Sequence, residues 1–133
     1  MTNPYDIGLD RNPANYQPLT PLTFLERAAL VFPKHTAIIH GDLRRDYAGL
    51  YSRCCKLASV LDRSGLGPGD TVSVMLLNTP AVIEAHSGVP MAGAALPSPK
   101  TRHGGASMGV QLTHARAHSV RTDCSPLQHL CAP

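Results

Sequence analysis

Aromatic and charged residues are both scarce in this 133-residue chain. It contains no Trp, two Phe and four Tyr, and Asp, Glu, Lys and Arg together make up 16% of it. Proteins that bind single-stranded nucleic acid stack the bases on aromatic side chains, so this composition disfavours that class. Hydrophobic residues, at 43%, are close to the average for globular proteins. The composition therefore predicts a folded domain rather than a disordered chain.

Long apolar runs and an export signal are also missing. Residues 1–10 contain two acids and no basic run that leads into an apolar stretch. No segment approaches the ~18 consecutive apolar residues of a membrane span. The four cysteines, Cys54, Cys55, Cys124 and Cys131, are then most simply reduced thiols. We therefore predict a cytoplasmic protein with no membrane span.

The net charge of +3 comes from one end of the chain. Residues 1–99 contain eight basic and eight acidic residues, whereas residues 100–133 contain four basic residues and only Asp123 as an acid. A basic segment can bind nucleic acid, and salt-sensitive binding would be its mark. The charges here are spread along the segment rather than clustered, so we favour a solvated basic end and predict no nucleic-acid partner.

The first half of the chain predicts two helices with a hairpin between them. Thr20-Pro21 is an N-cap followed by Pro in the first turn, and Pro33 ends the run. This helix carries Leu22, Leu25, Ala29 and Phe32 on one face. Residues 36–45 predict the hairpin. The second helix begins at the cap residue Asp46 and ends before Gly65, and its apolar stripe contains Leu50, Cys54, Leu57, Ala58 and Leu61.

The second half predicts strands that alternate with helices. Residues 71–77 are a nearly continuous apolar run, which is typical of a strand buried on both faces. Thr79-Pro80 caps a helix that Gly88 and Pro90 should kink or end. Short strands over 94–96 and 118–122 and a helix over 107–115 complete the order. Such alternation predicts an α/β protein with a doubly wound or similar three-layer sheet.

No set of residues predicts a complete catalytic site. Residues 64–70 are Gly-rich but lead from a helix into a strand, and residues 103–105 lack the Lys and Ser/Thr of a P-loop. Ser52 and Ser87 have no nucleophile motif around them. Glu84 and His86 are two residues apart on a helix, so their side chains do not face each other. We expect His86 to pack under the sheet.

A metal site has five candidate ligands near the C-terminal end. His114 and His118 are spaced i, i+4, and Cys124, His129 and Cys131 follow. Four such side chains can surround zinc, but their spacing matches no zinc-finger pattern. The predicted helix and strand also separate the two histidines. We therefore favour scattered side chains over a metal site.

Three stretches resemble one enzyme family. Residues 14–33, 65–80 (Gly-Leu-Gly-Pro-Gly-Asp-Thr-Val-Ser-Val-Met-Leu-Leu-Asn-Thr-Pro) and 84–94 are similar, in order and spacing, to the start of acyl-CoA synthetases. These enzymes belong to the adenylate-forming superfamily of AMP-dependent synthetases and ligases. After Leu96 the likeness thins, because residues 97–103 replace the family's Asn-rich turn and Arg-Leu-Asp. The resemblance divides the chain into an extended lead-in (1–19), the start of the family's N-terminal domain (20–96) and a diverged continuation or poorly ordered basic tail (97–133).

The resemblance implies an incomplete three-layer doubly wound sheet, as in the N-terminal domain of adenylate-forming enzymes. For the whole enzyme it implies ATP, Mg²⁺ and CoA as cofactors and a carboxylic acid as substrate, which becomes an acyl-CoA through an acyl-AMP. The family's Ser/Thr/Gly-rich loop ending in Pro-Lys-Gly is absent from this sequence. No catalytic, cofactor-binding or metal-binding residue therefore carries over, and we expect this chain to bind none of these cofactors.

Two kinds of protein remain compatible with the sequence. The first is the N-terminal part of an ATP-dependent acid–CoA ligase, inactive on its own. The second is a non-enzymatic accessory or interaction module, or the remnant of a truncated gene, which could associate with itself through an open sheet edge. Neither reading predicts ATP turnover by the 133 residues alone.

Overall fold

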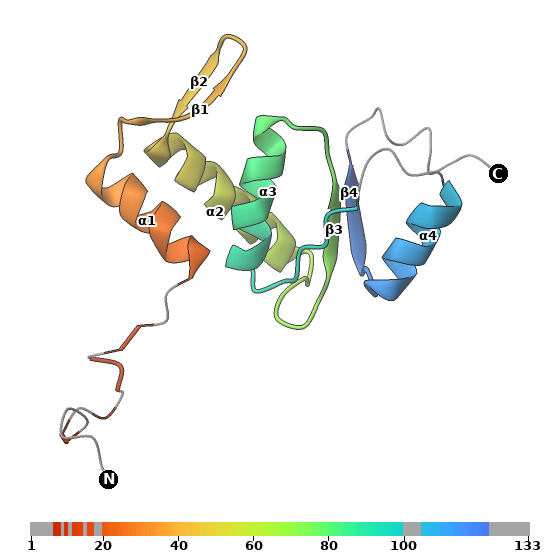
Figure 1. Cartoon of the computed structure of the whole chain (residues 1–133), viewed down its shortest axis with the longest axis horizontal. Helices are drawn as coiled ribbons and strands as arrows, with labels where there is room; N and C mark the ends of the chain where they lie inside the picture. Colours follow the sequence, from red (N-terminus) through yellow and green to blue (C-terminus); the bar gives the residue numbers. More distant parts are fainter. Residues whose placement is uncertain are drawn as a thin grey trace.

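The computed structural model describes residues 7, 8, 10, 12–14, 16, 17, 20–99 and 105–122. Four helices and four strands alternate along these residues, in the order α1–β1–β2–α2–β3–α3–α4–β4 (Figure 1). The helices are α1 (Pro21–Val31), α2 (Tyr47–Arg63), α3 (Pro80–Met91) and α4 (Gly105–His114). The strands are β1 (Thr36–His40), β2 (Leu43–Asp46), β3 (Val72–Met75) and β4 (Ser119–Thr122). The predicted order of elements is confirmed except for the strand over 94–96, which does not form as a regular strand.

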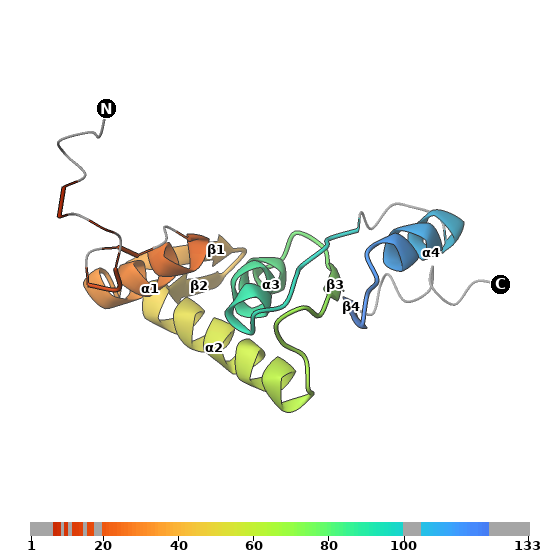
Figure 2. The same ribbon diagram turned by 90° about the horizontal axis from the view of Figure 1, so that it is seen from below.

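β3 and β4 lie between two sets of helices. The two strands pair in parallel, with Val72 opposite Ser119 and Met75 opposite Thr122. Figures 1 and 2 place α2 and α3 on one side of this pair and α4 on the other. Helices on both faces of parallel strands are the mark of a three-layer α/β fold. The predicted fold class, with its incomplete sheet, is confirmed.

The predicted strand over 94–96 is reduced to a single bridge. Ala95 lies beside Thr71 in parallel orientation, and the Val72 N–H donates to the Ala95 carbonyl at 2.9 Å. The Val74 N–H donates in turn to the carbonyl of Pro97 at 3.0 Å. Pro97 and Pro99 have no N–H to donate, so a regular ladder cannot continue through them. Both edges of β3 are thus occupied, one by β4 and the other by this segment.

The hairpin and α2 follow the predicted local signals. β1 and β2 pair antiparallel, and Gly41 takes a positive φ of 55° in the turn between them. At the start of α2 the Asp46 carboxylate accepts a hydrogen bond from the Gly49 N–H at 2.7 Å. Gly65, with φ of 75°, follows the C-cap residue Ser64. Both predicted ends of α2 are confirmed.

The N-cap residues of α1 and α3 are at the predicted positions, but their side chains do not make the expected capping hydrogen bonds. Thr20 and Thr79 occupy the N-cap positions with extended backbone, yet neither hydroxyl bonds to a helix N–H. Phe32 was expected on the buried face of α1. It is instead the C-cap residue and is 61% exposed, because its backbone has left the helical conformation. Only Leu25 of that face is fully buried.

The prediction that Gly88 and Pro90 kink or end α3 is confirmed for the end of the helix near Pro90, whereas Gly88 does not end it. The helix continues through Gly88 to Met91, one residue beyond Pro90. A Cβ atom at position 88 would lie 2.8 Å from Leu57 Cδ2 and 3.0 Å from the Cys54 carbonyl oxygen. Gly88 is therefore the point at which α3 approaches α2, and the packing gained there outweighs the low helix propensity of glycine.

Two buried clusters hold the described part of the chain together. The first joins α2, β3 and α3 and consists of Leu61, Val72, Val74, Ala85, Val89 and Ala94. The second joins α1, β1 and α2 and consists of Leu25, Ile38, Leu50 and Cys54. Because α2 contributes to both clusters, it connects the hairpin end of the molecule with the β3–β4 end.

Candidate functional site

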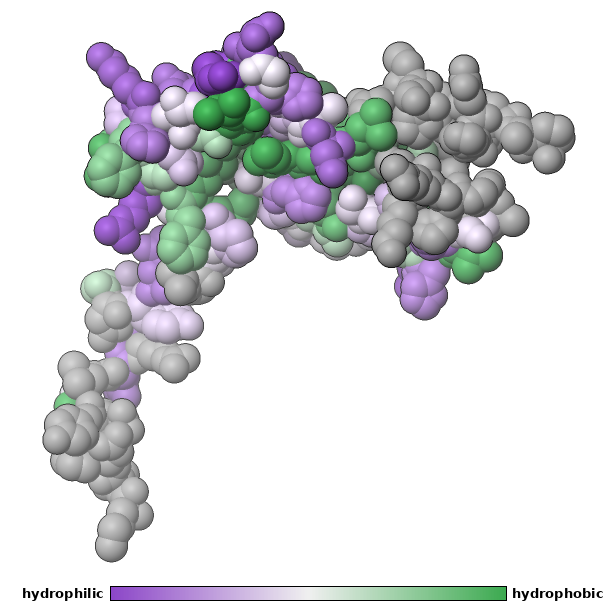
Figure 3. All heavy atoms as spheres, turned by 45° about the horizontal axis from the view of Figure 1, so that its top comes forward, coloured by the Kyte–Doolittle hydropathy of each residue, from purple (hydrophilic) through white to green (hydrophobic). Residues whose placement is uncertain are grey.

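An apolar hollow with charged groups at its rim lies between α2, β3 and α3, and we call it the α2–β3–α3 groove. Its volume is about 370 Å³. Val72, Val74 and Leu76 line it from the β3 segment, and Val60 and Ala81 line it from the flanking helices. It is lined in full by Arg53, Lys56, Leu57, Val60, Leu61, Val72, Val74, Leu76, Ala81, Glu84, Ala85 and Val89. Apolar side chains also reach the molecular surface elsewhere, among polar ones (Figure 3).

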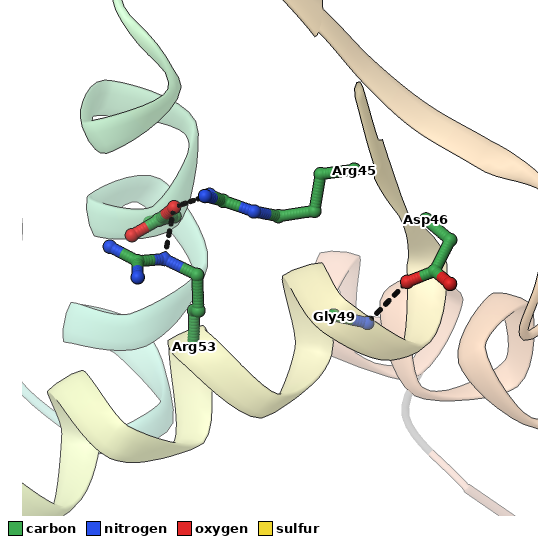
Figure 4. A network of polar contacts seen from close by, with 5 residues as sticks. Arg45, Asp46, Gly49 and Arg53 are labelled. Carbon is green, nitrogen blue, oxygen red and sulfur yellow. Dashed lines mark hydrogen bonds and ion pairs between the residues drawn. The ribbon is translucent and has the colours of Figure 1, made fainter. Parts of the chain in front are cut away.

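Two of the residues that line this groove, Glu84 and Arg53, belong to a polar network that also includes Arg45 (Figure 4). Glu84, on α3, is buried. Its Oε1 accepts a hydrogen bond from Arg53 Nε of α2 at 2.7 Å and a second from Arg45 Nη1 of β2. The carboxylate raises the pKa of the Arg53 guanidinium through this hydrogen bond and its charge. We call these three residues the Glu84 cluster.

The Glu84 cluster is suited to holding elements together rather than to proton transfer. One carboxylate oxygen accepts hydrogen bonds from both guanidinium groups, so this oxygen is poorly placed to take a proton from a substrate. The cluster connects the hairpin, α2 and α3. Sequence reasoning missed it, because its members are 31 and 39 residues apart from Glu84 along the chain. The available signal was a single acidic residue on a mostly apolar helix.

Cys54 is an unreactive thiol in this arrangement. It is fully buried in the cluster between α1, β1 and α2. Burial, followed by the charge of Glu84, raises the pKa of the Cys54 thiol to about 11. A thiol with such a pKa is protonated at neutral pH and is a poor nucleophile. Its neighbour Cys55 is exposed on the other side of α2.

The structure does not bring the other candidate catalytic residues together. His86 was expected under the sheet, but it is exposed, and its Nδ1 lies 2.7 Å from the Val82 carbonyl oxygen one turn earlier. The prediction fails because α3 turns its Glu84 and Ala85 side inward and leaves His86 outside. Ser52 is exposed, and Ser87 is half-buried with its hydroxyl in a hydrogen bond to the Cys54 thiol. Neither serine has a histidine partner in the described part of the chain.

His118 connects the start of β4 to the turn before β3. Its Nδ1 accepts a hydrogen bond from the Thr71 N–H at 3.1 Å, and its Nε2 lies 3.7 Å from Asp70 Oδ1. Asp70 in turn accepts a hydrogen bond from the Gly67 N–H at 2.9 Å through Oδ2. The Gly-rich segment 64–70 is therefore a turn between α2 and β3, as predicted, and not a phosphate loop.

The five candidate metal ligands are only partly within the described residues. His114 ends α4 and His118 precedes β4, whereas Cys124, His129 and Cys131 lie outside the described residues. Residues 20–99 and 105–122 contain no group of three side chains that could hold a metal ion. Of the second Gly-rich segment, His103 and Gly104 also lie outside the described residues.

The sequence profile of the AMP-binding enzyme family matches residues 25–132. This match covers most of the chain, so the chain belongs to the AMP-binding enzyme family, which is the family that the sequence resembles. The boundaries predicted at residues 19 and 96 stay a prediction.

Curated relatives within this family include acid–CoA ligases from plants. An acetate/butyrate–CoA ligase of Arabidopsis thaliana, named as peroxisomal, is 42% identical over 115 residues, which are 86% of this chain and 20% of that protein. A benzoate–CoA ligase of the same species, also named as peroxisomal, is 47% identical over 112 residues, or 84% of this chain and 19% of that protein. The chain therefore spans about one fifth of the length of the curated relatives it matches.

Solved structures agree on the fold. A fatty acyl CoA synthetase from Mycobacterium tuberculosis matches with a TM-score of 0.78 at 22% identity, over 82% of this chain and 22% of that one. The N-terminal subdomain of NpsA from Klebsiella oxytoca matches with a TM-score of 0.74 at 22% identity, over 79% of this chain and 27% of that one. The described chain thus has the fold of part of the N-terminal subdomain of adenylate-forming enzymes.

The helices were also compared with the dimensions of a membrane span. Among the residues that the structure describes, no helix has both the length and the apolar character needed to cross a bilayer.

Proposed function

We propose that this chain is the N-terminal portion of an ATP-dependent acid–CoA ligase and that its 133 residues alone do not carry out the reaction. The observation that supports this most is the 42–47% identity to acid–CoA ligases over about a fifth of their length. In the proposed whole enzyme, a carboxylic acid reacts with ATP to give an acyl-AMP and pyrophosphate. The thiol of CoA then displaces AMP to give the acyl-CoA.

The residues described here do not fit the groups that this reaction needs. The α2–β3–α3 groove has mainly aliphatic walls, and both arginines of the Glu84 cluster already donate hydrogen bonds to the Glu84 carboxylate. Binding of a triphosphate calls for clustered N–H donors, cations and Mg²⁺. The sequence also lacks a Ser/Thr/Gly-rich loop ending in Pro-Lys-Gly. We therefore derive no step of the reaction from these residues and assign them the role of scaffold.

The carboxylic acid and the compartment are narrower proposals. Acetate, butyrate and benzoate are the first acids to test, because relatives at 42–47% identity are named for them. Those two relatives are named as peroxisomal, whereas the sequence alone predicts a cytoplasmic protein. Fractionation of the source cells with peroxisomal and cytosolic marker enzymes decides between these two compartments.

A covalent chimera tests the proposed function. Residues 1–133 replace the matching fifth of the Arabidopsis acetate/butyrate–CoA ligase, and formation of acyl-CoA from acetate or butyrate, ATP and CoA is measured. The control is the same ligase without its matching segment. We expect the chimera to form acyl-CoA and the truncated control to be inactive. A chimera that folds but forms no acyl-AMP or acyl-CoA would overturn the proposal.

A further inference from the structure

The α2–β3–α3 groove is an apolar surface that the described chain leaves open. Val72 and Val74 are fully buried at its floor, whereas Val60 at its rim is 44% exposed. β3 is the central strand of the sheet, with β4 on one edge and residues 95–97 on the other. Domains of this architecture cover such a strand with helices along its whole length. Here α3 and part of α2 cover it, and the space of about 370 Å³ beside them stays empty.

The charged side chains at the rim of the groove favour a partner segment with acidic residues. Arg53 and Lys56 lie one turn apart on α2, and both line the groove. The Arg53 side chain is 53% exposed although its Nε bonds to Glu84, and Lys56 is exposed. Because Glu84 neutralises only one of the two arginines in its cluster, the rim keeps a net positive charge. A segment with an aliphatic face and acidic residues on its flank complements this surface.

The sheet is open at β4 as well. The β3–β4 sheet has two strands, and no other strand among the described residues pairs with the outer edge of β4. Val120 on this strand is 37% exposed. A sheet edge beside which no described strand lies can accept an added strand. The open groove and the open edge therefore belong to the same incomplete sheet.

We propose that the α2–β3–α3 groove is an interface for the remaining polypeptide of an AMP-binding enzyme, and that this polypeptide binds there even as a separate chain. The inference rests on the proposed function. Its occupant is chosen on length: relatives at 42–47% identity have about four times as much polypeptide outside the matching region as within it. Burial of the partly exposed apolar side chains of this groove by a further segment is favourable, and that polypeptide is the available cover.

Complementation by separate chains tests the inference. The full 133-residue chain is produced together with the Arabidopsis acetate/butyrate–CoA ligase that lacks its matching fifth. Co-purification and acyl-CoA formation are both measured, and the covalent chimera described above is run beside them. We expect the two separate chains to co-purify and to restore acyl-CoA formation.

A matched pair of variants tests whether the two chains associate through the groove. Val60→Glu puts a carboxylate on the groove rim, where an apolar cover would bury it, so we expect at least a tenfold weaker association. Ser59→Glu puts the same charge one position earlier on α2, at an exposed residue that does not line the groove, and should leave association unchanged. Lys56→Glu reverses a rim charge at an exposed position and should also weaken it. Circular dichroism of each isolated variant checks that its helices remain.

Four results would contradict the inference. An active covalent chimera without association of the separate chains removes the inference and leaves the proposed function standing. A folded but inactive chimera removes both. Equal association of the wild type and all three variants removes the groove as the interface. If sedimentation shows that the 133-residue chain forms a dimer that Val60→Glu dissociates, the groove belongs to a second copy instead.

Discussion

At the scale of single residues, the Glu84 cluster is the feature with the largest expected energetic weight. Glu84 is buried, and both of its arginine partners come from other elements. Removing the charge of Glu84 leaves two guanidinium groups close together with no counter-ion between them. Breaking a buried ion pair from one side is costly because the remaining charge is left uncompensated.

Glu84→Gln therefore lowers the free energy of unfolding by roughly 2–3 kcal/mol, discounted because Arg53 is half exposed. Urea unfolding followed by circular dichroism measures the change. Glu26→Gln is the control, since Glu26 is an exposed carboxylate on α1. A Glu84→Gln midpoint equal to that of the control would show that the cluster contributes no stability.

The Cys54 thiol gives a second prediction at this scale. Its pKa is raised from 9.0 to about 11, so the folded state favours the protonated thiol. This contribution to stability is fully present below pH about 9 and is lost as the pH rises through about 11. At pH 8 a variant that keeps only Cys54 should react with a thiol reagent roughly a hundredfold more slowly than one that keeps only the exposed Cys55. Similar rates for the two variants would contradict the burial of Cys54.

At the scale of elements, Gly88 in α3 and Gly109 in α4 differ in the space around them. A Cβ atom at Gly88 would lie 2.8 Å from Leu57 Cδ2, whereas a Cβ at Gly109 in α4 meets nothing within 4 Å. Alanine is favoured over glycine in both helices by up to about 1 kcal/mol of propensity. At position 88 this gain is opposed by the overlap with α2, because overpacking costs about 1–3 kcal/mol.

Gly88→Ala is accordingly expected to lower the free energy of unfolding by about 1–2 kcal/mol, and Gly109→Ala to raise it or leave it unchanged. Urea midpoints of the two variants measure the difference. If Gly88→Ala were at least as stable as Gly109→Ala, the close approach of α2 and α3 would be disproved.

The elements also show what the sequence could and could not predict. α2 was predicted with both ends because its signals are local: the Asp46 cap, the apolar stripe and Gly65 lie within the helix or next to it. The continuous helix through Gly88 was missed because its cause is a contact with Leu57, 31 positions away. The Glu84 cluster was missed for the same reason. The family resemblance was readable because it depends on residue identities and their order rather than on contacts.

At the scale of the whole molecule, the chain has the fold of part of the N-terminal subdomain of adenylate-forming enzymes. Its sheet is covered by α2 and α3 on one side and α4 on the other, and it stops at β4 (Figure 2). Among the described strands, β4 has a neighbour on one edge only, and such a strand is held less firmly than one with neighbours on both edges.

Hydrogen exchange of the 133-residue chain tests this difference in stability. The amides of β3, which is flanked on both edges and buried at all four residues, should exchange at least tenfold more slowly than those of β4. Binding of the complementary ligase polypeptide should slow exchange in β4. Equal protection of the two strands in the isolated chain would show that β4 is already covered.

The most direct test of the central claim is made on the native protein. An antibody raised against residues 14–60 is used to precipitate the product from extracts of the source cells, and the precipitate is examined for size and for ATP-dependent acyl-CoA formation. We predict a polypeptide several times larger than 14.2 kDa that forms acyl-CoA from a small carboxylic acid. A product of 14.2 kDa alone, with no ligase activity in the precipitate, would contradict the claim that this chain works as part of an acid–CoA ligase.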